Sequence, residues 1–228
     1  SFSSRNAAAP AGVPLKVLPN GRVSRVDQLK SQPRKPGEAS FFYADHHFQY
    51  DAVKVLPGEY YVSNEDLVVM TVLGSCIAAC IWDGKARTGG MNHFMLPDGD
   101  ADGGSGARYG SYSMELLING LLKRGARRER LESKVFGGGN VLQGFTSNPV
   151  GTRNAEFVLR YLKAERIPVL AQDLLGIHPR KVCYFPGTGS ALVKRLPHAH
   201  DDALVKAEKD YQRTLAKAIP AGGVELFD

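Results

Sequence analysis

Short apolar runs rich in β-branched side chains follow one another from residue 52 to residue 96, and this pattern predicts strands. Turn residues such as Pro57-Gly58 and Asp83-Gly84 separate the runs. A short connection follows the fourth run, so we expect the fourth and fifth strands to pair as neighbours in one sheet. The predicted strands are Ala52–Leu56, Glu59–Val62, Leu67–Leu73, Cys76–Trp82 and Gly89–Leu96.

A helical period alternates with strand patterns further along the chain. Ser111–Arg124 spaces its apolar residues three and four apart and stops at Gly125, which predicts an amphipathic helix. Asn154–Glu165 and Asp201–Ile219 predict two more helices. Because strands and helices interleave, the fold class is expected to be α+β. The later predicted strands are Leu131–Phe136, a run after Pro168, and a closing hairpin of Lys181–Phe185 and Ala191–Leu196.

The ends of the chain differ from its middle. Residues 1–40 lack sustained periodicity and are expected to form a flexible basic arm, so the domain proper is predicted to span residues 41–200. Residues 98–106 are all Gly, Asp, Ala or Ser, which predicts a mobile loop and a candidate lid. Residues 201–228 are predicted to form a C-terminal helix and a tail. The apolar cluster Val224, Leu226 and Phe227 suggests that this tail docks on a partner.

We expect no nucleic-acid partner despite the net charge of +6, because much of the excess lies in the basic arm. The uncharged stretch Leu67–Trp82 is shorter than the roughly 20 apolar residues that a membrane span requires. We therefore expect no membrane insertion and, without a recognisable secretory signal, a cytoplasmic location. Three cysteines are an odd count that fits reduced thiols rather than a disulfide framework.

Candidate chemistry centres on Cys76, which follows the small residues Gly74 and Ser75 at the end of a predicted strand. Small residues let a substrate approach the backbone and leave the N–H groups of Ser75 or Cys76 able to hold an oxyanion. His93 on a neighbouring predicted strand is a candidate base for the thiol. Two other interpretations remain open on spacing alone. Both residues could be ordinary core side chains, or Cys76, Cys80, Cys183 and His93 could bind zinc.

Five motifs in order then give these residues a context between about residue 52 and residue 196. Together the motifs resemble the CheD family of chemoreceptor glutamine deamidases. The resemblance implies mixed β-sheets packed face to face and flanked by helices, as in the catalytic domain of cytotoxic necrotizing factor toxins. The motifs are Thr71-Val-Leu-Gly-Ser-Cys76, Gly89-Gly-Met-Asn-His93-Phe-Met-Leu-Pro97, Arg108-Tyr-Gly110, Lys134-Val-Phe-Gly-Gly138 and Gly151-Thr-Arg-Asn154.

The same resemblance implies a Cys, His and Thr triad that hydrolyses receptor glutamines to glutamates without a cofactor or metal. The matching positions are Cys76 as nucleophile, His93 as base and Thr71 as the residue that orients the imidazole. Asn92 is the alternative orienting residue, although strand alternation points it to the opposite face. Pairing with His93 predicts a lowered thiol pKa for Cys76. Cys80 and Cys183 are interpreted as packing residues.

Two alternative activities stay open at this point. The same thiol could hydrolyse receptor glutamyl methyl esters, or the chain could be a non-catalytic regulator that binds a CheC-like phosphatase, a partner that the resemblance suggests. Chemoreceptor cytoplasmic domains are the expected main partners. One departure stands out, because many relatives read Asp-Leu-Gly-Gly where this chain reads Asp173-Leu-Leu-Gly176. The missing glycine is expected to alter a loop near the site or a partner surface.

Overall fold

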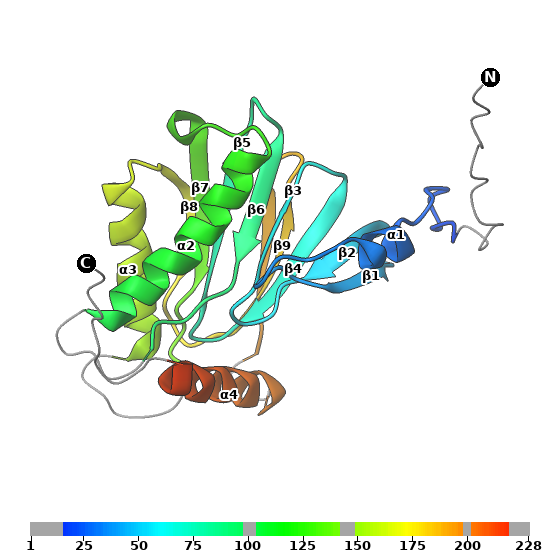
Figure 1. Ribbon diagram of the computed structural model, residues 1–228. Helices are drawn as coiled ribbons and strands as arrows, with labels where there is room; N and C mark the ends of the chain where they lie inside the picture. Colours follow the sequence, from blue (N-terminus) through cyan, green and yellow to red (C-terminus); the bar gives the residue numbers. More distant parts are fainter. Residues whose placement is uncertain (1–15, 98–103, 142–148, 198–201, 219–228) are drawn as a thin grey trace, which may run out of the picture.

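Two five-stranded sheets pack face to face and form the body of the molecule (Figure 1). The computed structural model describes residues 16–97, 104–141, 149–197 and 202–218. The predicted α+β class, with mixed sheets flanked by helices, is confirmed. The likeness to cytotoxic necrotizing factor toxins remains a prediction.

The first sheet has the order β1-β2-β4-β9-β10. Strands β2 and β4 are parallel, and the other neighbours are antiparallel. The predicted closing hairpin is confirmed as β9 and β10, which pair from Ser190 opposite Phe185. The bounds are β1 Phe41–Asp45, β2 Tyr50–Lys54, β4 Leu67–Leu73, β9 Arg180–Phe185 and β10 Ser190–Arg195.

The second sheet has the order β3-β6-β5-β7-β8, with only β7 and β8 parallel. Strands β5 and β6 are antiparallel neighbours, as predicted from the short connection between them. Strands β2 and β3 lie in different sheets, so the Pro57-Gly58 turn carries the chain between sheets instead of closing a hairpin. The bounds are β3 Tyr60–Ser63, β5 Ile77–Asp83, β6 Thr88–Asn92, β7 Leu131–Gly137 and β8 Val169–Leu174.

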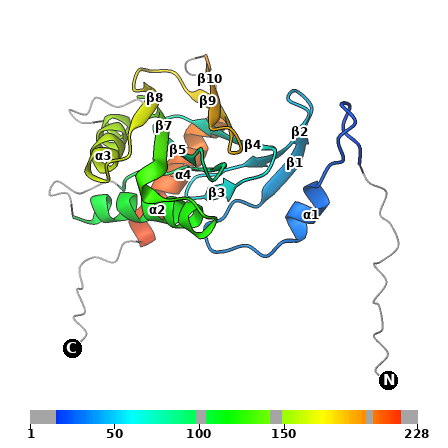
Figure 2. The same cartoon turned by 90° about the horizontal axis from the view of Figure 1, so that it is seen from above.

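Helices cover the second sheet and one end of the sandwich (Figures 1 and 2). The helices α2, Ser105–Lys123, and α3, Val150–Ala164, pack their apolar faces on the outer side of the second sheet. Helix α4, Asp202–Ala218, lies across the end of the two sheets. A 3-10 turn, Arg128–Arg130, precedes β7.

Helix α2 begins earlier than the predicted start at Ser111, because small residues in its first turns hide the helical period. Gly110 explains why they are small: a Cβ there would lie 2.5 Å from the ring of Phe157. Most of the predicted lid, residues 98–103, and the predicted tail after residue 218 lie outside the described residues. Within the described chain, none of the helices has the length and apolar character needed to span a bilayer.

The N-terminal segment packs more than the sequence suggests. From residue 16 it is part of the fold: Leu18, Leu29 and Ala39 are buried, and helix α1, Val26–Ser31, lies against β1. Asp51 accepts hydrogen bonds from the side chain of Ser24 and the backbone of Arg25. The expected start of the packed fold near residue 41 is therefore too late. The residues that pack are single apolar side chains scattered among charged ones. They form no helical or strand period from which the sequence could predict the packing.

Candidate active site

Cys76 ends a sharp turn, Gly74-Ser75-Cys76, that carries the chain from β4 in the first sheet to β5 in the second. Each of the three backbone carbonyl groups of the turn accepts a hydrogen bond. The N–H groups of Gly138 and Gly139 donate to Cys76 and Gly74 at 2.9 and 3.0 Å, and the Asn154 amide donates to Ser75 at 2.8 Å. These donors belong to or adjoin two of the five motifs, so those motifs clamp the turn that carries the thiol.

The clamp requires glycine at the end of β7. Gly137 has a φ of 110°, a conformation that residues with a Cβ rarely adopt. A Cβ at this position would lie 2.0 Å from the carbonyl oxygen of Cys76. The glycine therefore permits the close approach that fixes the turn.

His93 directly follows β6, and Thr71 on β4 meets its imidazole from the other sheet. Thr71 Oγ1 lies 2.8 Å from His93 Nδ1 and 2.7 Å from the carbonyl oxygen of Val55. A carbonyl oxygen can only accept, so the single hydroxyl proton goes to Val55 and the hydroxyl accepts from His93. The ring therefore carries its proton on Nδ1, and its Nε2 is left with a lone pair.

The imidazole of His93 lies beside the thiol. The Sγ atom of Cys76, a ring nitrogen of His93 and a carboxylate oxygen of Glu208 all lie within 4.8 Å of one another. Nε2 is buried and has no hydrogen-bond partner in the part of the chain that the structure describes. The structure thus brings Cys76, His93 and Thr71 together, in an order that suits a thiol, its base and a residue that orients the base.

Asn92 lies on the other face of the strand, as alternation predicts. Its side-chain oxygen accepts from the Ala79 N–H at 2.9 Å, and its amide donates to the Ser113 carbonyl at 3.4 Å. Its amide also lies 3.3 Å from the sulfur of Met114. Asn92 therefore ties β6 to β5 and α2, and its hydrogen bonds go to these elements and not to the imidazole.

Glu208 of α4 is the member of the site that sequence reasoning missed. Its carboxylate accepts hydrogen bonds from the N–H groups of Gly74, Ser75 and Cys76 at 2.7, 2.8 and 3.2 Å. The Ser75 hydroxyl also donates to it at 2.7 Å. The predicted anion-binding N–H groups of the turn thus converge, and in this structure they hold a carboxylate from the same chain. The available signal was a glutamate on the apolar stripe of a predicted helix.

Burial decides the protonation of the pair. Burial raises the pKa of the Cys76 thiol well above its ordinary value, and the Glu208 carboxylate beside it raises the pKa further. Burial lowers the pKa of His93 to about 4, against the opposing effect of Glu208. The lowered thiol pKa predicted from the sequence is wrong for this arrangement, because α4 excludes water and sets a negative charge against the sulfur.

Cys80 and Cys183 are buried away from this group. Among the described residues, the cluster of possible metal ligands contains Cys76, His93 and Glu208 and neither of the other cysteines. The four-ligand zinc set considered from the sequence is therefore not assembled. The Glu208 oxygens are also engaged by four N–H and O–H donors, an arrangement typical of a bound anion.

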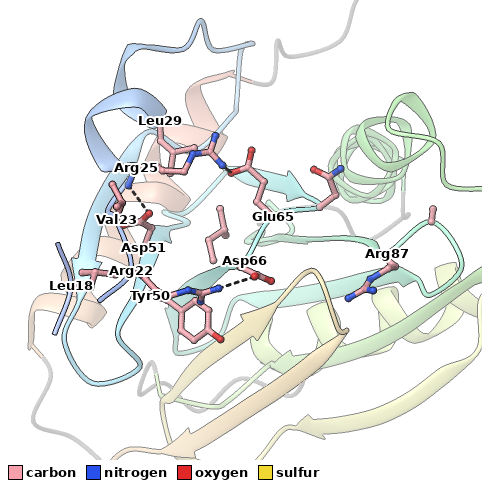
Figure 3. A pocket seen from close by; sticks show the side chains of 13 residues that line it. Leu18, Arg22, Val23, Arg25, Leu29, Tyr50, Asp51, Glu65, Asp66 and Arg87 are labelled. Atoms are coloured by element: carbon pink, nitrogen blue, oxygen red, sulfur yellow. Dashed lines mark hydrogen bonds and ion pairs between the residues drawn. The ribbon is translucent and has the colours of Figure 1, made fainter. Parts of the chain in front are cut away.

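Two cavities lie in different parts of the fold. One of about 200 Å³ lies between α4 and the sheets, lined in part by Thr71, His93 and Leu204. A larger one of about 600 Å³ lies between the N-terminal segment and the body (Figure 3). Four of its charged side chains form two ion pairs, Arg22–Asp66 and Arg25–Glu65, both 2.8 Å long. The larger cavity therefore lies at the boundary between the N-terminal segment and the body of the fold. The smaller cavity adjoins the thiol site.

Comparisons with known proteins place this chain in a family. A family model described as CheD chemotactic sensory transduction matches residues 95–195. A probable chemoreceptor glutamine deamidase CheD 1 of Albidiferax ferrireducens is 66% identical over 232 residues, which cover 99% of each chain. The chain belongs to the CheD family. The family predicted from the five motifs is confirmed.

Other CheD relatives are nearly as similar. A probable chemoreceptor glutamine deamidase CheD of Xanthomonas campestris pv. campestris strain B100 is 60% identical over 186 residues, which cover 82% of this chain and 94% of the relative. One of Stenotrophomonas maltophilia strain K279a is 58% identical with the same coverage. A solved structure of a Neisseria meningitidis protein overlaps with a TM-score of 0.31 at 10% identity over 51% of each chain, which is too little to bear on the fold.

The segment Asp173-Leu-Leu-Gly176, where the resemblance led us to expect a glycine at position 175, has a strained backbone conformation at Leu175. Leu175 has a φ of 67°, in the left-handed region that favours glycine, and its side chain is 41% exposed. Its N–H donates to the Gly137 carbonyl at 2.9 Å, and its carbonyl accepts from Arg180 at 2.6 Å. The loop therefore keeps the geometry that a glycine would adopt and braces the end of β7, close to the turn that carries Cys76.

Proposed function

We propose that this chain is a protein-glutamine deamidase that acts on chemoreceptor cytoplasmic domains, with Cys76 as its nucleophile. The observation that carries the proposal is the hydrogen bond from His93 to Thr71, which leaves Nε2 unprotonated on an imidazole that lies beside the thiol. The names of its CheD relatives supply the substrate class. Since that substrate faces the cell interior, we also propose a cytoplasmic site of action.

In the first half-reaction, His93 Nε2 takes the thiol proton and the Cys76 sulfur attacks the carboxamide carbon of a glutamine side chain. The N–H groups of Gly74, Ser75 and Cys76 lie together beside the sulfur and can stabilise the oxyanion that forms. As the C–N bond breaks, the imidazolium returns its proton to the departing ammonia. A thioester remains on Cys76.

In the second half-reaction, neutral His93 removes a proton from a water molecule, and the resulting hydroxide attacks the thioester carbon. The C–S bond breaks, the thiolate regains its proton from the imidazolium, and glutamate is released. Thr71 keeps the imidazole in one orientation and one tautomer through both steps, which is a positioning role. Water is the only co-reactant.

The test is mass spectrometry of a receptor cytoplasmic fragment incubated with the wild-type chain or with Cys76→Ala. Conversion of specific glutamines to glutamates by the wild type alone supports the proposal. Equal conversion by both chains would remove Cys76 from the mechanism. A methylated receptor fragment assayed in parallel shows whether the thiol also hydrolyses glutamyl methyl esters.

A further inference from the structure

Helix α4 buries a single stripe of side chains, and one of them is charged. The stripe contains Leu204, Glu208 and Leu215, which are buried, and Tyr211, which is half-buried, at the spacing of one helical face. Glu208 is fully buried, with 0% of its surface exposed. A buried carboxylate is costly unless its hydrogen bonds are replaced, so packing alone does not favour glutamate at this position.

The hydrogen bonds that replace those to water come from the turn Gly74-Ser75-Cys76. Three backbone N–H groups and the Ser75 hydroxyl donate to the two oxygens of Glu208, at 2.7 to 3.2 Å. The three N–H groups are those that the proposed reaction uses to hold the reacting carbonyl oxygen. Glutamate is also the side chain that glutamine deamidation produces. Glu208 therefore presents, on a helix, the product of the proposed reaction at the proposed reaction site.

We propose that α4 is a built-in product mimic: its Glu208 side chain occupies the position of the deamidated glutamine and keeps the active site closed until α4 is displaced. The inference rests on the proposed function and extends it to regulation and to the form of the substrate. Because the mimic is helical, the enzyme receives its glutamine on an intact helix with apolar side chains on the same face.

The seat of α4 has the features that a helical substrate requires. Leu204 lines the cavity beside His93, and Tyr211 hydrogen-bonds through its hydroxyl to the hydroxyl of Tyr109, within the Arg108-Tyr-Gly110 motif. The ring of Tyr211 also lies 3.2 Å from the position of a Cβ on Gly58, so it rests against the turn before β3. A substrate helix in this seat would find an apolar contact on each side of its glutamine.

Closure also explains the state of the thiol. Cys76 and His93 are 0% and 2% exposed, so neither can meet a protein substrate while α4 is seated. The Glu208 carboxylate raises the pKa of the Cys76 thiol. Displacement of α4 would expose the sulfur, remove the negative charge and free the N–H groups in one step.

The first experiment measures alkylation of Cys76 by iodoacetamide at neutral pH, followed by peptide mass spectrometry. Glu208→Ala and Leu204→Asp, which loosens α4 without touching the turn, should each raise the rate at least about tenfold, because thiol reactivity follows exposure and thiolate content. Lys209→Ala, on the exposed side of α4, is the matched control and should react like the wild type. Thermal unfolding of each variant confirms that it is folded. Wild-type rates in folded Glu208→Ala and Leu204→Asp would overturn the inference.

The second experiment places a substrate residue in the site with Glu208→Gln. A glutamine held at the product position should lose its amide as ammonia and become glutamate within the same molecule, at a rate independent of protein concentration. Gln212 in the same helix is the internal control, and the double variant Cys76→Ala, Glu208→Gln should keep its introduced glutamine. If the introduced glutamine persists in a Glu208→Gln enzyme that is able to deamidate receptor fragments, the product-mimic assignment is overturned.

The receptor assay separates the two proposals. Conversion of receptor glutamines by the wild type and by Glu208→Ala at equal rates would support the proposed function and overturn closure by α4. Faster conversion by Glu208→Ala supports both. If alkylation accelerates in Glu208→Ala while neither chain converts receptor glutamines, the proposed function fails and the covering of the thiol by α4 stands.

Discussion

Thr71 Oγ1 lies 2.8 Å from His93 Nδ1, and the same oxygen donates its proton to the Val55 carbonyl at 2.7 Å. One hydroxyl thus fixes both the orientation and the tautomer of the imidazole. A base that depends on one contact loses its geometry when the contact is removed, even though the thiol and the ring are untouched.

Thr71→Val keeps the shape of the side chain and removes the hydroxyl. We expect kcat to fall roughly 10- to 100-fold, because two buried polar atoms lose their partner and the ring is free to adopt the other tautomer. Thr71→Ser restores a hydroxyl and should recover most of the activity. Steady-state kinetics on a receptor fragment, with thermal unfolding as control, decides the matter. Equal loss in the Val and Ser variants would point to packing instead of orientation.

Cys76→Ala and His93→Ala should each abolish deamidation, with kcat at least about 1000-fold below that of the wild type, because nucleophile and base act as one unit. The double variant should be no worse than either single variant. Cys80→Ala and Cys183→Ala are the matched controls, because both thiols are buried in the core outside the site. Loss of activity in Cys80→Ala as deep as in Cys76→Ala, in a folded protein, would contradict the assignment.

Leu175→Gly should stabilise the fold, because it relieves a left-handed backbone conformation at a residue whose side chain is partly exposed. The expected gain in the free energy of unfolding is about 0.5 to 1 kcal/mol, since the strain relieved exceeds the added backbone entropy of glycine. Gly176→Ala, next in the chain with a φ of 74°, should destabilise instead. Urea unfolding of both variants measures the difference, and a loss of stability in Leu175→Gly would show that the leucine side chain holds the loop.

Asp83 predicts a pH dependence of stability. Its burial opposes ionisation, but hydrogen bonds from Arg130 and from backbone N–H groups of Ala86 and Arg127 outweigh that effect and lower its pKa to about 2. In the unfolded chain the pKa is about 3.9, so the unfolded state binds more protons between these values. The contribution of Asp83 is therefore complete above about pH 4 and is lost as the pH falls towards 2.

The measurement is the free energy of unfolding of the wild type and of Asp83→Asn between pH 2 and pH 6. The variant should be less stable at pH 6 and should lack the part of the acid-side slope that Asp83 supplies. Parallel slopes in the two proteins would show that Asp83 does not titrate in this range.

Most strands and helices could be predicted from the sequence, because runs such as Leu67–Leu73 and Ser111–Arg124 carry a local period. The packing of Leu18 and Leu29 could not, since isolated apolar residues leave no period. The parallel pairing of β2 with β4 was equally hidden, because the residues that pair are set by the packing of whole sheets.

The candidate site also has a part that the sequence predicted and a part that it did not. Motif resemblance pointed to Cys76, His93 and Thr71, whereas spacing alone left the core and zinc interpretations open. Glu208 escaped because an acidic residue on a helix is ordinarily assigned to the solvent side, and only the assembled fold shows the four donors that bind it. A charge inside an apolar stripe, such as Glu208 between Leu204 and Tyr211, is the pattern to examine in other sequences.

The position of the thiol at the crossing between the sheets bears on how the molecule folds. Thr71 belongs to one sheet, His93 follows a strand of the other, and Cys76 sits on the turn that joins them. Neither sheet alone can assemble the three, so a partly folded chain with a single sheet formed has no working site. Activity should then appear only in the step in which the two sheets dock. When refolding is monitored by an activity assay, no partly folded intermediate should be active.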